Sequence, residues 1–282
     1  MPSLICPVCS SALKQSENLK NFQCEHLHLF DLAKQGYINL LLSHRKKSKQ
    51  PGDTNEMVIA RREFLNRNHY ERVVNEFEIL ANKYCSKASD IAYADLGCGE
   101  GYYTERLHRL FSQNSNAVTT CGIDISTPAI KSACKRDKSI RWVVASASHI
   151  PLASASQDLA SCLFFRFDAH EVARTLKTDA ILISANTGPE HLIELREHLY
   201  DDVKTEKAET SFTDNDRLEH LYTKNIKHQI ELNSHTEIEQ LVSMTPHYWR
   251  AKPEKKQALL TLEYLKVSLD IRFDIYRRTS AL

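Results

Sequence analysis

The sequence predicts an α/β protein in which helices cover both faces of a mainly parallel sheet, preceded by a small metal-binding module. Two observations predict this architecture. After about residue 90, short apolar strands alternate with amphipathic helices, which is typical of a parallel sheet buried on both faces. Before residue 43, cysteine and histidine recur at a spacing that suits a zinc ion. A length of 282 residues allows about two domains.

Composition excludes several classes of protein. Hydrophobic residues make up 42% and charged residues 26% of the chain, which is typical of a globular protein. Only 7 glycines and 8 prolines are present, which excludes a collagen-like or low-complexity chain. No apolar run approaches the roughly 20 residues that cross a bilayer, and the start lacks the pattern of a secretory signal. We therefore expect a cytoplasmic protein without a membrane partner, in which close cysteines serve a metal or catalysis.

Basic residues are concentrated near the N-terminus. Residues 1–50 contain seven Lys or Arg and three acidic residues, a net charge of +4, whereas the whole chain carries +1. A basic N-terminal segment on a mildly acidic body suits a polyanionic partner such as RNA. A solvated surface explains the charge equally well, and charge alone does not separate the two interpretations.

The first element in the chain is a candidate zinc module. Cys6, Cys9, Cys24 and His28 follow the pattern C-x2-C-x14-C-x3-H. Two close pairs on two turns can place four donors in a tetrahedron around Zn²⁺. A segment this short has almost no hydrophobic core, and a bound metal would therefore supply its folding energy. We expect a structural zinc site. His26 is a rival for the fourth ligand position.

The sequence divides into three parts. Residues 1–42 form the zinc module, 43–56 a basic linker that ends in a Pro-Gly turn, and 57–282 the larger domain. The aromatic residues Phe22, Phe30 and Tyr37 either form the small core of the module or stack on RNA bases.

The larger domain begins with a helical pattern over residues 55–84, interrupted near 66–69. Near the end, apolar residues alternate from 265 to 275, which predicts a half-buried antiparallel strand. Ser234 begins a capping box for a short helix. The remaining strands are expected at 91–96, 118–123, 140–145, 159–165 and 180–185, and the remaining helices at 102–111, 126–134, 168–176 and 189–200.

A glycine-rich turn follows the first of these strands. Asp95 is followed by Gly97, Gly99 and Gly101, so three of the chain's seven glycines lie within seven positions. Glycine lets the backbone turn sharply and approach a ligand closely. Ligands bind at the carboxyl ends of strands in open α/β sheets. The next strand ends in Asp124, where a carboxylate can accept both hydroxyls of a ribose.

This pattern of an acid, three alternate glycines and a second acid resembles the S-adenosylmethionine site of class I methyltransferases. A purely structural glycine-rich turn is the alternative. The resemblance implies a class I, Rossmann-like methyltransferase domain with a mixed seven-stranded sheet, and S-adenosyl-L-methionine as the methyl donor.

Further motifs along the chain make the resemblance more specific. They are the zinc motif with the Phe30-Asp31 and Gly36-Tyr37 pairs that follow it, Pro51-Gly52-Asp53, Ala60-Arg61-Arg62, His69-Tyr70, Gly188-Pro189 with His191-Leu192, Met244-Thr245-Pro246 and Trp249-Arg250. Together they resemble the RlmA family of 23S rRNA (guanine-N1)-methyltransferases over nearly the whole chain.

The family resemblance implies a homodimer that binds zinc and methylates a guanosine in a 23S rRNA hairpin near the peptide exit tunnel, with no DNA partner. It also implies that Tyr70, Gly99, Glu100 and His191 contact the methyl donor. By their own sequence contexts, Tyr70 reads as a packed core residue and His191 as a surface residue in the first turn of a helix. Residues 164–168, after the fourth strand, depart from the family pattern.

Guanine N1 carries a proton that must leave during methylation, so a nearby proton acceptor would assist the reaction. Asp168, close to the end of the fourth strand, is the candidate catalytic residue. The zinc module and the basic run Arg45-Lys46-Lys47-x-Lys49 would hold phosphates of the hairpin. Two other functions stay open: a class I methyltransferase with another RNA or protein acceptor, and a non-catalytic RNA-binding protein that keeps the fold.

Overall fold

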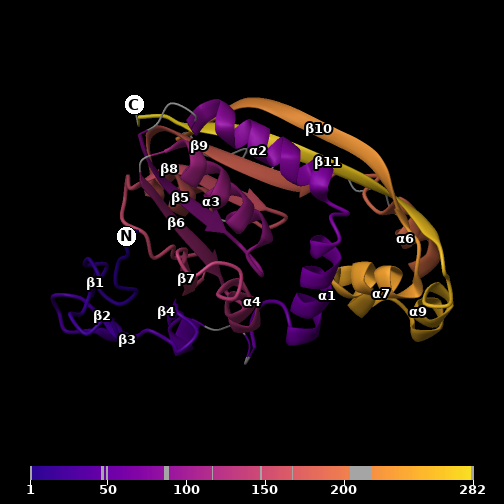
Figure 1. Ribbon diagram of the computed structural model, residues 1–282, viewed down its shortest axis with the longest axis horizontal. Coiled ribbons are helices and arrows are strands. Elements are labelled where there is room, and N and C mark those ends of the chain that lie inside the picture. The colour runs from indigo at the N-terminus through magenta and orange to yellow at the C-terminus, as the bar shows by residue number, and fades with distance from the viewer. Residues whose placement is uncertain are drawn as a thin grey trace.

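A computed structural model of the chain shows one long mixed sheet with helices on both faces (Figure 1). The structure describes residues 2–45, 48, 50–85, 89–115, 117–146, 148–166, 168–203 and 217–280, without the side chains of Arg45 and Trp249. Lys46, Lys47 and Lys49 of the expected basic run lie outside the described residues. No helix in the described ranges is long and apolar enough to cross a membrane.

The central sheet has eight strands in the order β10-β11-β9-β8-β5-β6-β7-β4. Strands β4 to β9 run parallel to one another, and β11 pairs antiparallel with both β9 and β10. The strands are β4 (Tyr37–Asn39), β5 (Asp90–Leu96), β6 (Ala117–Asp124), β7 (Arg141–Val144), β8 (Gln157–Leu163), β9 (Leu176–Thr187), β10 (Leu218–Leu232) and β11 (Leu265–Arg278). Seven of them come from the larger domain, and this confirms the expected mixed sheet.

The eighth strand comes from the N-terminal segment. β1 (Lys14–Gln15), β2 (Asn21–Gln23) and β3 (Leu29–Asp31) form a separate antiparallel sheet, whereas β4 pairs in parallel with β7 at the edge of the main sheet. Leu4, Leu13 and Phe22 pack in one buried cluster with Leu96 and Val143 of the main sheet. The zinc module is therefore docked on the sheet through a shared apolar core. Phe22 and Tyr37 are buried, as expected for core residues.

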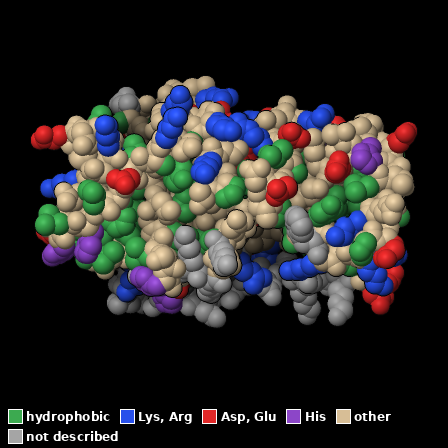
Figure 2. Space-filling view, turned by 90° about the horizontal axis from the view of Figure 1, so that it is seen from below, with side chains coloured by type: hydrophobic (Ala, Val, Ile, Leu, Met, Phe, Trp, Pro, Cys, Tyr) green, Lys and Arg blue, Asp and Glu red, His purple; other side chains and the backbone are tan. Residues whose placement is uncertain are grey.

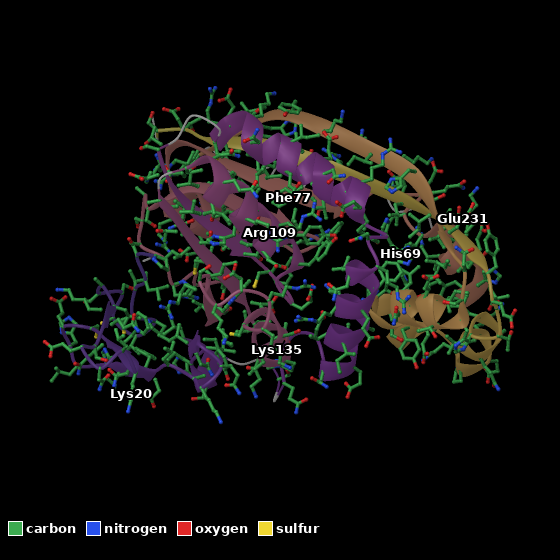
Figure 3. The ribbon with its side chains drawn as sticks, viewed as in Figure 1. Lys20, His69, Phe77, Arg109, Lys135 and Glu231 are labelled. Atoms are coloured by element: carbon green, nitrogen blue, oxygen red, sulfur yellow. The ribbon has the colours of Figure 1, made fainter. Side chains whose placement is uncertain are left out.

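The helices are α1 (Asn55–Asn66), α2 (Glu71–Cys85), α3 (Tyr102–Asn114), α4 (Thr127–Ala133), α5 (Ala169–Thr175), α6 (Ile193–Leu199), α7 (His235–Ser243), α8 (Pro246–Arg250) and α9 (Pro253–Leu259), with a 3-10 turn at Ser43–Arg45. Helices α2 and α3 cover the sheet face opposite the zinc module, where Phe77 of α2 packs in the core (Figures 1 and 3). Asn68, with φ 63°, breaks the helical run between α1 and α2 where the sequence predicts an interruption.

The C-terminal half differs from expectation in four places. Helices α8 and α9 were not expected from the sequence. Leu218–Leu232 forms the long edge strand β10, which the sequence analysis did not assign. β9 extends beyond residues 180–185 at both ends, because Leu176 pairs with Gln157 of β8 and β11 pairs with β9 up to Thr187. The helix expected at 189–200 begins only at Ile193, since the preceding residues turn to reach Asp270 and Ser268 of β11. The sequence predicted His191 in the first turn of this helix, but His191 lies before the helix begins.

Candidate functional site

The four expected zinc ligands lie together on two turns of the N-terminal module. Their ligand atoms all lie within 4.8 Å of one another. Cys9 Sγ is 3.7 Å from Cys24 Sγ, and His28 Nδ1 is 3.3 Å from Cys24 Sγ and 3.6 Å from Cys6 Sγ. A tetrahedral zinc ion with its usual bond lengths requires S–S edges of about 3.8 Å and S–N edges of about 3.6 Å. The residues present therefore fit zinc.

Local contacts prepare these side chains for a metal. The N–H of Val8 donates to Cys6 Sγ at 3.4 Å, which is typical of a tight knuckle. The backbone N–H of Ser11 is the main cause that lowers the pKa of Cys9 to about 6, which favours the thiolate that binds metals. His26 lies outside the group of four, exposed beside Glu25. The geometry thus favours His28 over His26 as the fourth ligand.

The glycine-rich turn lies at the carboxyl end of β5, between β6 and β8. Gly97, Gly99 and Gly101 have φ values of 77°, 56° and 88°, a region that favours glycine. The N–H of Gly97 donates to Ile123 O at 2.8 Å, which ties the turn to β6. A Cβ on Gly101 would lie 2.8 Å from the Trp142 ring, whereas a Cβ on Gly99 would meet no atom within 4 Å. Gly99 therefore faces open space that a ligand can fill.

The buried Asp95 side chain stabilises the glycine-rich turn. It accepts hydrogen bonds from the hydroxyls of Ser161 on β8 at 2.7 Å and of Thr104 on α3. Burial raises the pKa of Asp95 to about 6, although both hydroxyl groups oppose the shift. Asp95 thus links β5, β8 and α3 around the glycine-rich turn.

Asp124 lies at the end of β6 on the other side of the turn. Its Oδ2 accepts the N–H of Gly99 at 2.9 Å and its Oδ1 accepts the N–H of Ser126 at 2.7 Å. Burial raises its pKa despite these contacts. The Ser126 hydroxyl donates to Asp53 O at 2.7 Å, so the Pro51-Gly52-Asp53 segment closes against the end of β6. Asp124 therefore borders the open space beside Gly99, where a ribose could reach it.

Glu100 is buried within the turn and paired with Arg136. The side chain of Glu100 is only 1% exposed and that of Arg136 only 7%, and the closest atoms of the pair are 2.6 Å apart. Arg136 also donates to the Glu100 carbonyl at 3.1 Å and to Asn66 Oδ1 at 3.0 Å. Among the described residues, Glu100 Oε1 has no hydrogen-bond partner although it is buried. One carboxylate oxygen of Glu100 thus lacks a partner among the described residues, while the other is held by Arg136.

Tyr70 and His191 meet across 121 residues of sequence. The Tyr70 hydroxyl lies 3.4 Å from His191 Nε2, and the N–H of Asp270 donates to His191 Nδ1 at 3.4 Å. Burial lowers the pKa of His191 to about 3 and raises that of Tyr70. His191 is therefore a neutral, half-buried residue between Tyr70 and β11, and not the exposed histidine that its sequence context suggests. Tyr70 also has an edge-on ring contact with Phe164, at the carboxyl end of β8.

Asp168 caps helix α5. Its Oδ1 accepts the N–H groups of His170 at 2.9 Å and Glu171 at 3.1 Å, and the side chain is exposed. This contact gives Asp168 a structural role at the side of the sheet where β8 ends. Phe167, the residue before it, lies outside the described residues.

Arg136, Thr104 and Ser161 also belong to the site, although the sequence did not indicate them. Thr104 lies nine residues after Asp95, so the pairing of a strand end with the first turn of the next helix could have indicated it. Arg136 follows α4 and has no sequence signal, because only the tertiary fold brings it to Glu100.

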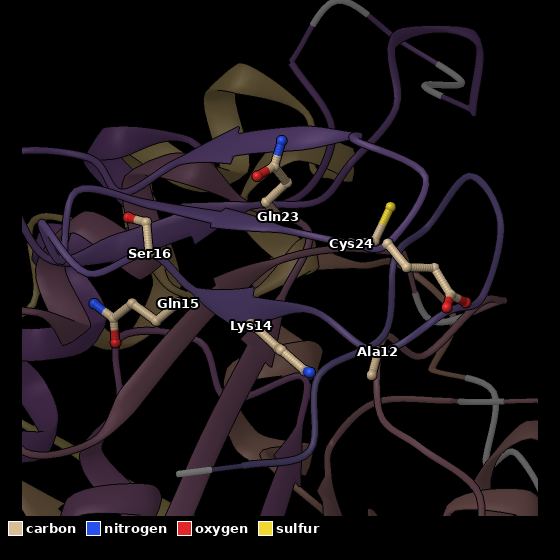
Figure 4. A pocket seen from close by; sticks show the side chains of 7 residues that line it. Ala12, Lys14, Gln15, Ser16, Gln23 and Cys24 are labelled. Carbon is tan, nitrogen blue, oxygen red and sulfur yellow. The ribbon is translucent and has the colours of Figure 1, made fainter.

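The surface has a hollow and a groove in the views of Figures 2 and 4. Viewed from below, Figure 2 shows a hollow near the middle of the molecule with lysine and arginine side chains beside it. A shallow groove of about 390 Å³ lies on the zinc module, lined by Lys14, Gln15, Gln23 and other residues (Figure 4). These features offer basic and polar surface but do not by themselves define a ligand.

Comparison with known proteins agrees with both parts of the site. Residues 4–49 match the family described as "RlmA, N-terminal", a zinc ribbon, and residues 94–180 match a methyltransferase domain. A protein of Micromonospora griseorubida named for 23S rRNA (guanine-N1) methylation is 28% identical over 98% of both chains. The 23S rRNA (guanine(748)-N(1))-methyltransferase of Streptomyces fradiae is 28% identical over 68% of this chain and 66% of its own.

Among solved structures, the YcgJ protein of Bacillus subtilis is similar, with a TM-score of 0.47 and 15% identity over 73% of this chain and 100% of its own. The methyltransferase domain and the zinc ribbon imply S-adenosyl-L-methionine and Zn²⁺ as the two cofactors. The chain therefore contains a methyltransferase domain and, at its N-terminus, an RlmA-type zinc ribbon.

Proposed function

We propose that this protein transfers the methyl group of S-adenosyl-L-methionine to N1 of a guanosine in a 23S rRNA hairpin near the peptide exit tunnel. One structural observation carries the methyl-transfer part: the open space at Gly99, whose N–H donates to Asp124. The names of the relatives support the choice of 23S rRNA and of guanine N1.

The donor site is assembled from the residues around the glycine-rich turn. Asp124 would accept the ribose hydroxyls, Gly99 would admit the donor close to the backbone, and Asp95 would keep the turn in place. Tyr70 and His191 would close the site with neutral groups, because burial keeps both uncharged near neutral pH. When bound, S-adenosyl-L-methionine supplies a methyl group already activated on its sulfonium.

The protein's main contribution is then to orient the acceptor atom in line with that methyl group. The target guanine must leave its stack to enter the site. The N1 proton needs an acceptor, and we propose Asp168, whose contact with α5 holds it at the end of β8. The zinc ribbon, held by Cys6, Cys9, Cys24 and His28, would position the hairpin through its phosphates. We further propose a cytoplasmic homodimer, as the family resemblance implies.

Radiolabelled methyl transfer onto unmodified 23S rRNA tests this function. Because N1 methylation blocks base pairing, reverse transcription should stop at a single guanosine. Label on another RNA or on a protein would favour a different acceptor, and RNA binding without label would favour a non-catalytic protein. The variant Asp168→Asn keeps a good helix cap, so loss of transfer without loss of folding would support the proton-acceptor role. Sedimentation of the pure protein measures the oligomeric state.

A further inference from the structure

Two adjacent phenylalanines are exposed where strand β8 ends. Phe164 is 37% exposed and Phe165 is 40% exposed, although both side chains are large and apolar. They lie beside the glycine-rich turn, since a Cβ on Gly97 would come within 2.9 Å of Phe165 Cβ. Exposed apolar surface next to a ligand site favours a role in binding over a role in folding.

The backbone holds Phe164 in an unfavourable conformation. Its φ of 60° lies in the left-handed region, which is rare for a bulky residue. The Phe164 N–H donates to Ala185 O on β9 at 2.7 Å, and the Cys162 thiol donates to Phe165 O. The ends of two neighbouring strands therefore fix this strained residue. Strain of this kind is concentrated at functional sites, where it orients a side chain.

One part of the Phe164 ring packs against an aromatic wall formed by Tyr70 and Tyr103. The centroid of the Phe164 ring lies 6.5 Å from that of Tyr70, in an edge-on contact, and 6.1 Å from that of Tyr103. Tyr70 is buried behind it and is held by His191. The wall orients the ring, and the exposed part of Phe164 remains available to a flat ligand.

The order of the strands places the aromatic wall and Asp124, the proposed ribose contact, on opposite sides of the glycine-rich turn. The strands run β8-β5-β6, so Phe164 at the end of β8 and Asp124 at the end of β6 lie on opposite sides of the β5 turn. A donor whose ribose reaches Asp124 extends toward β6. The space beside Phe164 is thus on the side left for the acceptor.

We propose that Phe164 is the platform on which the unstacked acceptor guanine lies during methyl transfer. The inference rests on the proposed function and adds a residue that determines acceptor binding. Aromatic side chains hold bases in single-stranded nucleic acids by stacking, which requires a π-face and not merely apolar volume. Phe164→Leu should therefore impair RNA use, and Phe164→Tyr should preserve it.

The experiment measures initial rates of methyl transfer against 23S rRNA concentration at saturating donor, together with donor affinity by calorimetry. Loss of one stacked base predicts a roughly 5- to 150-fold fall in kcat/KM for the RNA in Phe164→Leu. Phe164→Tyr should stay within about threefold of the unaltered protein, and donor affinity should be unchanged in both variants. The matched control is Tyr264→Leu, which removes an aromatic ring that is 52% exposed in the loop before β11.

Two results would overturn the inference: unchanged RNA kinetics in Phe164→Leu, or a loss of donor affinity that accounts for its slower transfer. Failure of the proposed function itself would give a different result from failure of the Phe164 assignment. If the unaltered protein binds the donor but transfers no label to 23S rRNA, the proposed function is wrong and the acceptor assignment is wrong with it.

Discussion

Replacing Gly99 by alanine tests the donor site most directly. A Cβ at this position meets no protein atom within 4 Å, so the substitution introduces no clash within the protein. The residue does have a φ of 56°, and a left-handed conformation costs a non-glycine residue about 1–2 kcal/mol. The added methyl group would occupy space that we assign to the donor.

Gly99→Ala should have two separate effects, one on the stability of the fold and one on donor affinity. The backbone cost of about 1–2 kcal/mol lowers the melting temperature by roughly 2–8 °C in a protein of this size. Steric overlap with a bound ligand typically costs about 1–3 kcal/mol. At about 1.4 kcal/mol per tenfold change, donor affinity should weaken by roughly 5- to 150-fold.

Gly36→Ala is the matched control. Gly36 lies in the zinc module, also has a positive φ, 98°, and would likewise place a Cβ in open space. Calorimetric titration with S-adenosyl-L-methionine and with its demethylated product measures affinity, and thermal denaturation measures stability. Both variants should lose some stability, but only Gly99→Ala should lose affinity. Equal affinities for the unaltered protein and Gly99→Ala would refute the assignment of this space to the donor.

Three further predictions concern the zinc ligands and the buried charges. Cys9→Ser should lower bound zinc well below one equivalent per chain, as measured by metal analysis; full retention would exclude Cys9 as a ligand. Because the pKa of Asp95 is raised to about 6 from about 3.8, its protonated form stabilises the fold below pH 4, and this stabilisation, about 3 kcal/mol, is lost as pH rises toward 6. The free energy of unfolding relative to Asp95→Asn should therefore fall across that range, as measured by denaturant titrations at several pH values. A difference that stays constant with pH would contradict the raised pKa of Asp95. Arg136→Met leaves the Glu100 carboxylate buried without its cation and should cost about 3–5 kcal/mol, much of it restored by adding Glu100→Gln; failure of the second change to restore stability would contradict the pairing.

Local spacing in the sequence was sufficient for the parts of the site that lie within single turns. The C-x2-C and C-x3-H pairs each lie on one turn, so their spacing already limits where the ligand atoms can lie. The three glycines after Asp95 likewise mark a turn at a strand end, because the required positive φ values strongly favour glycine. Alternating apolar residues predicted β11 because a half-buried strand has a period of two.

Contacts between distant segments could not be predicted in this way. Tyr70 and His191 are 121 residues apart, and Glu100 and Arg136 are 36 apart, so no local periodicity relates them. β10 carries mostly polar residues and is recognisable as a strand only from its pairing with β11.

The sequence by itself thus determined the zinc motif, the glycine-rich turn and the alternation of strands and helices, because each depends on neighbouring residues. Only the tertiary structure decided that β4 joins the main sheet, that the zinc module packs on the sheet face, and that Phe164 lies strained beside the glycine-rich turn. These features depend on which surfaces bury each other, and burial is a property of the whole folded chain.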